Sequence, residues 1–209
     1  MENRKKNEVL EDYSPDEGKF LLKLAKSTIA ERLGIPFDKE SGEIKFSDQS
    51  FNDKFLNEKK GVFVTLHLNG SLRGCIGNLE PRETILQGVI NNSINAAFYD
   101  PRFSPLSMDE FSGIDIEVSI LSRPEKLEYS DGKDLVSKLE PGVDGVIISK
   151  GRAGATFLPQ VWDQLPDAGS FLSQLCKKAG LPADEWEKGD LDVKIYHVQY
   201  FNEKPLYRV

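Results

Sequence analysis

Cys75 is the residue of this chain best suited to covalent chemistry. It lies between Gly74 and Gly77, where the missing side chains let a ligand or another backbone come close. Arg73 lies two residues away, and in a regular strand it shares the face of Cys75, where a cation favours the nucleophilic thiolate. A free cysteine is also commonly a small core residue. The sequence therefore leaves open two interpretations, a reactive thiol and a structural one, and we expect the thiol to be only partly exposed.

A reactive thiol needs an acid–base partner, and the chain has two histidines. In the hairpin that the sequence predicts around Asn69-Gly70, His67 points away from Cys75 and should not be its base. His197 lies in a predicted strand, where a histidine is more often a structural residue than a catalytic base. A carboxylate such as that of Glu117 is the alternative base. The candidate catalytic residues are therefore Cys75 and Glu117.

A second group of residues has the types that bind a small polar molecule. Arg73 is suited to hold an anionic group. In a central strand we expect it to be at least partly buried and paired with a carboxylate, with Glu117 as first choice. Asp100 and Arg102 lie in a loop that its prolines stiffen. Each charged residue taken singly is better explained by a structural ion pair, but together with the glycines they are suited to line a polar cleft. The candidate ligand-binding residues are Arg73, Gly74, Gly77, Asp100, Arg102, Ser119 and Gln160.

Metal and phosphate-loop chemistry have little support in the sequence. The two cysteines and two histidines include no closely spaced pair, and the sequence has no HExxH, CxxC or P-loop motif. The glycine-rich stretch at 151–154 lies in a predicted hairpin turn rather than before a helix. We therefore predict no metal site, and the sequence leaves any cofactor unknown.

The hairpin that carries Cys75 is predicted by Asn69-Gly70, the strongest signal for a two-residue turn. Such a turn fixes the register of the flanking strands. Regular pairing then places Leu66 opposite Arg73 and Val64 opposite Cys75 on one face. The other face is predicted to carry Phe63, Thr65, His67, Leu72 and Ile76.

The rest of the chain mixes helices with hairpins. This mixture predicts an α+β fold with a mainly antiparallel sheet and flanking helices. In the strand over 114–121, alternation places Asp115, Glu117 and Ser119 on the exposed face. Capping residues, periodicity and turn residues predict helices over 14–34, from 78–81 onward and over 168–179, strands over 114–121 and 193–201, a hairpin over 144–158, and an irregular connection over 37–60.

Composition excludes several classes of function. The chain has 209 residues and a formal net charge of −7, which argues against generic binding to nucleic acids or anionic membranes. It has no apolar run of membrane-spanning length and no signal-peptide pattern at its start, so we expect a cytoplasmic protein with no membrane association. Without a long linker, the chain is predicted to form a tail, residues 1–13, and a single domain, residues 14–209.

The stretch Leu72-Arg73-Gly74-Cys75-Ile76-Gly77 resembles the signature hexapeptide of the AMMECR-type domain family, the A component of the AmmeMemoRadiSam system. The similarity covers nearly the whole chain from Ser14 onward. Further family-like stretches follow in the expected order at Gly61–Leu66, Asp100–Leu106, Ile116–Ser122 and Leu158–Gln160.

This resemblance implies a compact α+β unit with a larger and a smaller lobe, and a cleft between them that the hexapeptide faces. It supplies neither a reaction nor a cofactor, and it suggests Memo-like and radical-SAM proteins as partners. One hypothesis is an enzyme or enzyme component that binds a small polar ligand in the cleft, with Cys75 as nucleophile or redox thiol. The other is a non-catalytic binding or scaffold module. Catalysis requires Cys75 to be reachable by solvent and to have an acid–base partner.

Overall fold

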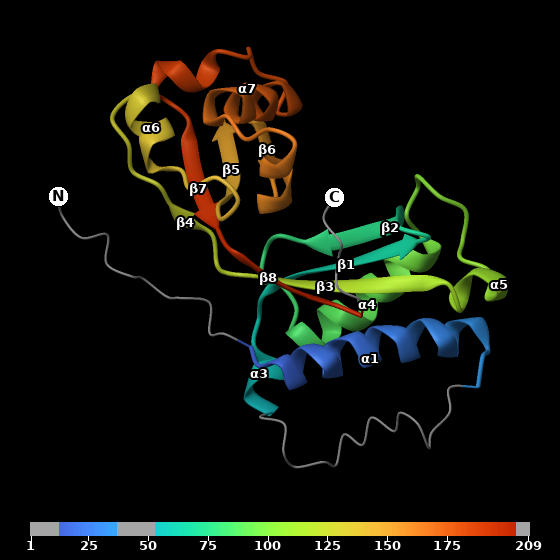
Figure 1. Cartoon of the computed structure of the whole chain (residues 1–209). Coiled ribbons are helices and arrows are strands. Elements are labelled where there is room, and N and C mark those ends of the chain that lie inside the picture. Colours follow the sequence, from blue (N-terminus) through green and yellow to red (C-terminus); the bar gives the residue numbers. More distant parts are fainter. Residues whose placement is uncertain (1–12, 37–52, 204–209) are drawn as a thin grey trace. The chain divides into compact units, whose positions relative to one another are not determined.

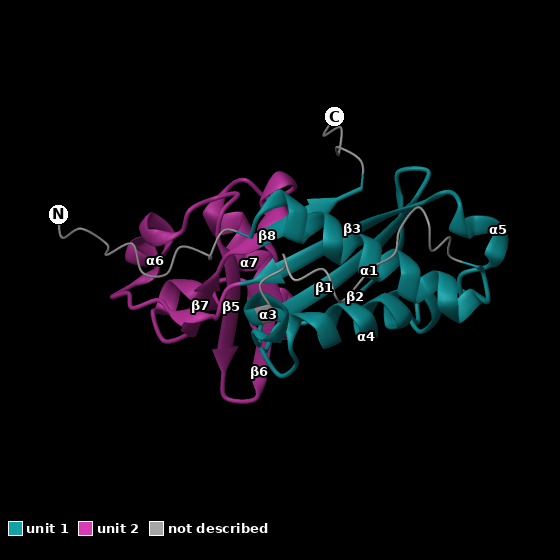
Figure 2. Ribbon diagram, turned by 90° about the horizontal axis from the view of Figure 1, so that it is seen from below, with its two compact units in different colours: residues 1–121, 199–209 teal, residues 122–198 magenta. Residues whose placement is uncertain are grey.

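The computed structural model describes residues 13–36 and 53–203 of the chain (Figure 1). Contacts divide the chain into two compact units (Figure 2): unit 1 is Met1–Leu121 with Gln199–Val209, and unit 2 is Ser122–Val198. The predicted tail lies outside the described residues except for Tyr13. The prediction of one domain over residues 14–209 stays a prediction, because the lobes of a single domain can also have cores of their own.

Unit 1 is built on a four-stranded sheet in the order β2-β1-β3-β8, in which β1 pairs antiparallel with both β2 and β3. Helices α1 and α4 pack on one side of this sheet (Figure 1). Val62, Val64 and Leu66 of β1 are buried on that side and form part of the core. The elements of unit 1 are α1 (Pro15–Leu33), α3 (Asp53–Asn57), β1 (Gly61–Leu68), β2 (Ser71–Asn78), α4 (Ile85–Phe98), α5 (Met108–Phe111), β3 (Ile114–Leu121) and β8 (Val198–Asn202).

The helices of unit 1 begin where side chains cap them. Ser14 and Glu17 form the predicted capping box of α1, and Gly34 ends this helix with a left-handed φ of 71°. The predicted start of the second helix at 78–81 is wrong. Helix α4 begins at Ile85, because the Thr84 side chain accepts the backbone N–H of Gln87 and so provides its cap.

The β1–β2 hairpin confirms the predicted turn but not the predicted register. Asn69 and Gly70 both have positive φ, as a tight hairpin turn requires. Leu68 pairs with Ser71 as expected, but the register then shifts at Arg73, which is the extra residue of a β-bulge. Beyond the bulge Thr65, not Val64, lies opposite Cys75.

The bulge moves Cys75 to the other face of the sheet. Partners in directly opposite positions share a face, so Cys75 shares the face of Thr65 and also of His67, two residues along β1. The prediction that His67 and Cys75 lie on opposite faces is therefore wrong. A regular register would have put Arg73 beside Leu66 in the core, where an unpaired charge is costly; the bulge places Gly74 there instead.

Unit 2 has its own four-stranded sheet, in the order β4-β7-β5-β6, with antiparallel pairing throughout. Its core includes Trp162 and Phe171, whose rings stack with centroids 3.7 Å apart. The predicted hairpin over 144–158 and the helix over 168–179 are both present. The elements of unit 2 are β4 (Glu125–Lys126), α6 (Gly132–Lys138), β5 (Gly145–Lys150), β6 (Ala153–Phe157), η1 (Pro159–Asp163), α7 (Ala168–Lys178), η2 (Glu185–Lys188) and β7 (Asp192–Tyr196).

Two predicted segments differ from the structure. The last strand, predicted over 193–201, is two strands that belong to different sheets, because pairing breaks at His197 between β7 and β8. The irregular connection predicted over 37–60 lies outside the described residues up to 52, and α3 occupies 53–57. Among the residues that the structure describes, no helix is both long enough and apolar enough to cross a membrane.

Candidate functional site

One face of the unit 1 sheet carries three of the polar candidate residues, Cys75, Glu117 and Ser119. It is the side of β1 opposite the buried Val62, Val64 and Leu66, and we call it the polar face. Thr65 of β1 lies between Cys75 of β2 and Glu117 of β3, since it pairs with both. The residues of the polar face on these three strands are Gly61, Phe63, Thr65, His67, Leu72, Cys75, Gly77, Asp115, Glu117, Ser119 and Leu121.

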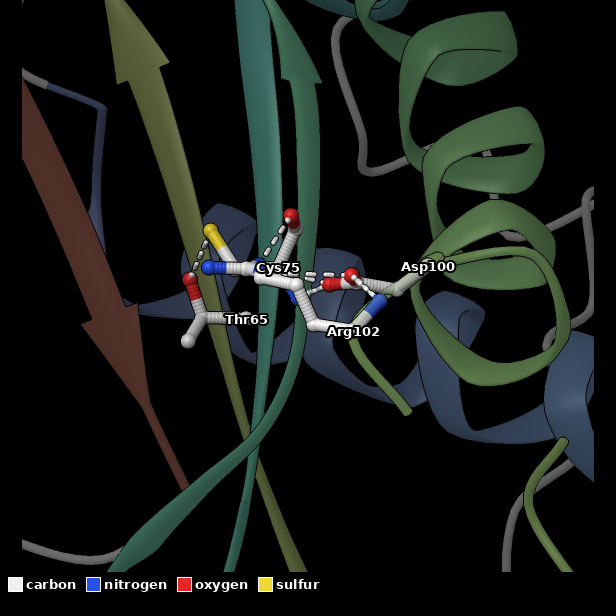
Figure 3. A network of polar contacts seen from close by, with 4 residues as sticks. All are labelled: Thr65, Cys75, Asp100 and Arg102. Carbon is white, nitrogen blue, oxygen red and sulfur yellow. Dashed lines mark hydrogen bonds and ion pairs between the residues drawn. The ribbon is translucent and has the colours of Figure 1, made fainter. Parts of the chain in front are cut away.

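The Cys75 thiol is half-buried and interacts with Thr65. The Thr65 hydroxyl lies 3.3 Å from the sulfur, and the two side chains point toward one another (Figure 3). Glu117 is two strands away, a backbone separation of about 10 Å. The prediction that Cys75 is only partly exposed is confirmed. Within the described chain no hydrogen bond joins the Cys75 sulfur to His67 or Glu117, so neither is placed as its base in this structure.

Asp100 and Arg102 hold the backbone of Cys75 at the edge of the sheet (Figure 3). Because β2 is an edge strand, its outward N–H and C=O groups need partners other than a strand. The Cys75 N–H donates to Asp100 Oδ2 at 2.8 Å, and Arg102 Nη2 donates to the Cys75 carbonyl at 3.1 Å. Arg102 Nε and Nη2 also donate to Asp100, at 2.9 and 2.6 Å.

Charge and burial differ sharply within this pair. The Asp100 side chain is 1 % exposed, whereas that of Arg102 is 53 % exposed. Hydrogen bonds from the Arg102 guanidinium hold the pKa of Asp100 well below its usual range, despite the opposing effect of burial. The Asp100 carboxylate in turn raises the pKa of Arg102, and the nearby Cys75 side chain adds to the rise. Thus a fixed and half-exposed cation lies beside the thiol.

Arg73 takes a different place from the one predicted. It is largely buried and paired with a carboxylate, as expected, but the partner is Glu110 rather than Glu117. Arg73 Nε and Nη2 donate to the two Glu110 oxygens at 2.8 and 3.0 Å, and Nη2 also donates to the Ser104 carbonyl. These bonds lower the pKa of Glu110 to about 2. The structure therefore uses Arg73 to anchor the 104–110 segment.

The two glycines of the hexapeptide are explained by packing inside the protein. A Cβ on Gly74 would lie 2.2 Å from the Ala96 carbonyl oxygen, so Gly74 lets α4 approach β2. A Cβ on Gly77 would lie 2.2 Å from the Phe63 ring, so Gly77 makes room for that ring on the polar face. Neither glycine needs a ligand to account for it, and their ligand-binding role stays a prediction.

Glu117 and Ser119 are more buried than their strand pattern predicted. Both face away from the apolar core, yet they are 9 % and 3 % exposed. The Ser119 hydroxyl donates to Glu117 Oε1 at 3.2 Å. Alternation alone predicted an exposed face here; the structure instead gives a buried carboxylate with a hydroxyl donor, in the same row as Thr65 and Cys75.

Unit 2 contains the remaining candidate residue, Gln160, and also His197. Gln160 lies in η1, and its role in a site with Cys75 stays a prediction. His197, interpreted as an ordinary strand residue, has its Nε2 3.2 Å from Asp144 Oδ1. Asp144 is buried and also accepts the Glu140 N–H. Within residues 13–36 and 53–203, no group of three or more His, Cys, Asp or Glu residues could hold a metal ion.

The residue that sequence reasoning underrated is Thr65. A threonine at this position in a strand is ordinary, and only the bulge reveals that it contacts Cys75. The sequence identifies Arg102 as a candidate, but it does not predict the hydrogen bond from Arg102 to the Cys75 carbonyl. A signal was present: a regular register would have put Arg73 in the core, and this conflict pointed to a bulge.

Comparison with known proteins identifies relatives over most of the chain. A model of the AMMECR1 family matches residues 22–201. A protein of Methanothermobacter thermautotrophicus is 40% identical over 91% of this chain and 98% of its own length, and one of Methanopyrus kandleri is 39% identical over 93% and 92%. The crystal structure of an uncharacterized protein from Pyrococcus horikoshii has a TM-score of 0.75 at 35% identity, covering 90% of this chain and 92% of that one.

Proposed function

Because the chain belongs to the AMMECR1 family, we propose that it is an enzyme or enzyme component that binds a small polar ligand on the polar face of unit 1. The observation that carries this proposal is the position of Arg102. Its guanidinium is fixed by a buried carboxylate, as a binding cation must be, but its side chain stays 53 % exposed. The guanidinium is therefore held in a fixed position and is still accessible to a ligand.

The unused donor of Arg102 supports an anionic group on the ligand. Nε and Nη2 donate to Asp100 and Cys75. Nη1 is used for neither Asp100 nor the Cys75 carbonyl, so it is able to donate to a carboxylate or phosphate. Thr65 adds a partly exposed hydroxyl group on the polar face, where it is suited to orient the rest of the ligand. In this proposal Cys75, which lies on the edge strand next to Thr65, also contacts the ligand.

The proposal is tested by titrating the full chain with inorganic phosphate and with succinate while backbone amides are followed by NMR. We expect shifts at Thr65, Cys75 and Arg102 that disappear in Arg102→Gln. Arg82→Gln is the matched control, because the Arg82 side chain is 77 % exposed in an ion pair with Glu80. Binding that is absent in the parent, or equal in Arg102→Gln and the parent, would count against the proposal.

A second candidate is a non-catalytic binding or scaffold module for protein partners such as Memo-like or radical-SAM proteins. It is favoured by large apolar side chains exposed on unit 1: Leu72 at 42%, Tyr99 at 61% and Met108 at 56%. A pull-down with purified partners of these two classes tests it. Loss of capture in Tyr99→Ser and Met108→Ser, with phosphate and succinate titrations unchanged, would support this function; equal capture by these variants would oppose it.

A further inference from the structure

Cys75, Thr65 and Arg102 together form a setting for oxidation of a thiol. The Thr65 hydroxyl is 3.3 Å from the sulfur, and the Arg102 guanidinium is anchored on the carbonyl of the same cysteine at 3.1 Å. We propose that Cys75 is a site of reversible oxidation by small hydroperoxides, promoted by Thr65 and Arg102. This goes beyond the proposed function, because oxidation of the thiol requires no ligand on the polar face.

The reaction is a two-electron transfer at sulfur. The Cys75 thiol first releases its proton to solvent, and the thiolate then attacks one oxygen of the hydroperoxide. An S–O bond forms as the O–O bond breaks, so the sulfur is oxidised to sulfenic acid and the peroxide is reduced. The departing oxygen takes a proton from solvent and leaves as water or, from an organic hydroperoxide, as an alcohol.

The neighbouring side chains match the needs of this step. A hydroxyl both donates and accepts, so Thr65 is able to accept the O–H of the incoming hydroperoxide beside the sulfur. Negative charge develops on the departing oxygen, and the Arg102 guanidinium, held at the carbonyl of the same cysteine, supplies a cation to stabilise it. Asp100, 1 % exposed, keeps both the Cys75 backbone and the guanidinium in place and acts as a positioning residue.

The second cysteine has none of these features. Cys176 is 0% exposed in the core of unit 2, and burial raises the pKa of its thiol. It is therefore a poor target for peroxide and a poor source of a thiolate to capture a sulfenic acid. We expect an external small thiol to reduce oxidised Cys75, through a mixed disulfide.

The experiment measures sulfenic acid formation in the full chain carrying Cys176→Ala. Reduced protein is mixed with hydrogen peroxide, the sulfenic acid is trapped with dimedone, and the adduct on Cys75 is followed by mass spectrometry. The same chain unfolded in urea gives the rate of a cysteine without this setting. We expect the folded chain to react faster by about tenfold or more, the effect of one charge-assisted hydrogen bond in the transition state.

Two variants distinguish an effect of Thr65 and Arg102 on the oxidation rate from simple solvent exposure of the thiol. Thr65→Val and Arg102→Gln should each bring the rate most of the way back to that of the unfolded chain, while Arg82→Gln should react like the parent. Circular dichroism establishes that each variant is folded. A folded parent that reacts no faster than the unfolded chain overturns the proposal, whether or not the variants fold. Folded variants that react like the parent overturn it as well.

Discussion

Two arginines near Cys75 serve different ends, although both pair with a carboxylate. Arg73 lies at the bulge, its side chain 12 % exposed, and its partner Glu110 is 27 % exposed. Arg102 lies at the sheet edge with the reverse arrangement, a buried Asp100 under a half-exposed guanidinium. At the bulge the cation, Arg73, is largely buried and the anion is partly exposed. At the edge the anion, Asp100, is buried and the cation is exposed to solvent.

The difference shows how position in a motif can mislead about role. Arg73 belongs to the hexapeptide and is the natural candidate for an anion-binding residue. Its donors, however, are directed to Glu110 and to the Ser104 carbonyl. Arg102 lies outside the hexapeptide but contacts its central cysteine. We therefore expect the bulge arginine to contribute stability and the edge arginine to serve the proposed chemistry, and substitutions test this division of roles.

The largest effect is expected from Arg73→Ala. Removing one partner of a largely buried pair takes the donor from the Ser104 carbonyl and leaves Glu110 with Ser107 as its remaining donor. Arg73 Nη1 is itself buried without a hydrogen-bond partner, which offsets part of the loss. We expect the free energy of unfolding of unit 1 to fall by about 2 kcal/mol, with the native alkylation rate of Cys75 unchanged.

The measurement must report on unit 1 itself. Both tryptophans, Trp162 and Trp186, lie in unit 2, so their fluorescence would follow the wrong transition. Hydrogen exchange of amides in β1 and α4 gives the stability of unit 1. If Arg73→Ala were as stable as the parent but lost phosphate or succinate binding, the bulge arginine would be the functional one and the comparison would be reversed.

A smaller effect is expected when acid titrates the bulge pair. Its hydrogen bonds with Arg73 and Ser107 lower the pKa of Glu110 from 4.5 to about 2. Because the folded value lies below the unfolded one, the pair stabilises unit 1 fully above about pH 4.5 and loses this stabilisation as the pH falls toward about 2. Glu110→Gln should therefore be less stable than the parent at pH 7, by about 1–2 kcal/mol.

The variant should also show a weaker loss of stability between pH 4.5 and 2, measured by hydrogen exchange or by urea unfolding at each pH. The matched control is Glu80→Gln, since Glu80 is 69% exposed in its ion pair with Arg82 and should change little. An acid profile identical to that of the parent would mean that the bulge pair does not stabilise the fold.

Much of the fold is readable from the sequence because its signals are local. The capping box of α1, the Asn69-Gly70 turn and the alternation of β3 each depend on residues within one element. The bulge at Arg73 is not local in this sense. The bulge keeps the charge of Arg73 out of the core and lets this residue pair with Glu110, which lies 37 residues away in the chain.

The site was predictable in its membership and not in its contacts. The flanking glycines identify Cys75, and the stiff loop identifies Asp100 and Arg102; the structure does bring the three together. Which side chain meets the thiol depended on the register, and a shift of one residue exchanges the two faces of a strand. Thr65 therefore stayed hidden, and Glu117 was assigned too direct a relation to Cys75.

The smallest effect on stability is expected at Cys75 itself. A cysteine in a closed apolar slot tolerates alanine better than serine, because a buried hydroxyl needs a partner. Cys75 is instead half-buried, and the Thr65 hydroxyl is available to a serine at this position. Both Cys75→Ala and Cys75→Ser should therefore change the free energy of unfolding of unit 1 by less than about 1 kcal/mol.

If serine destabilised unit 1 by about 2 kcal/mol more than alanine did, the thiol would be a structural core residue and the edge region would lose its chemical role. Near-equal stability of the two variants, with rapid alkylation of the parent thiol in a Cys176→Ala background, would instead sharpen the contrast between a bulge that holds the fold and an edge that presents a reactive group.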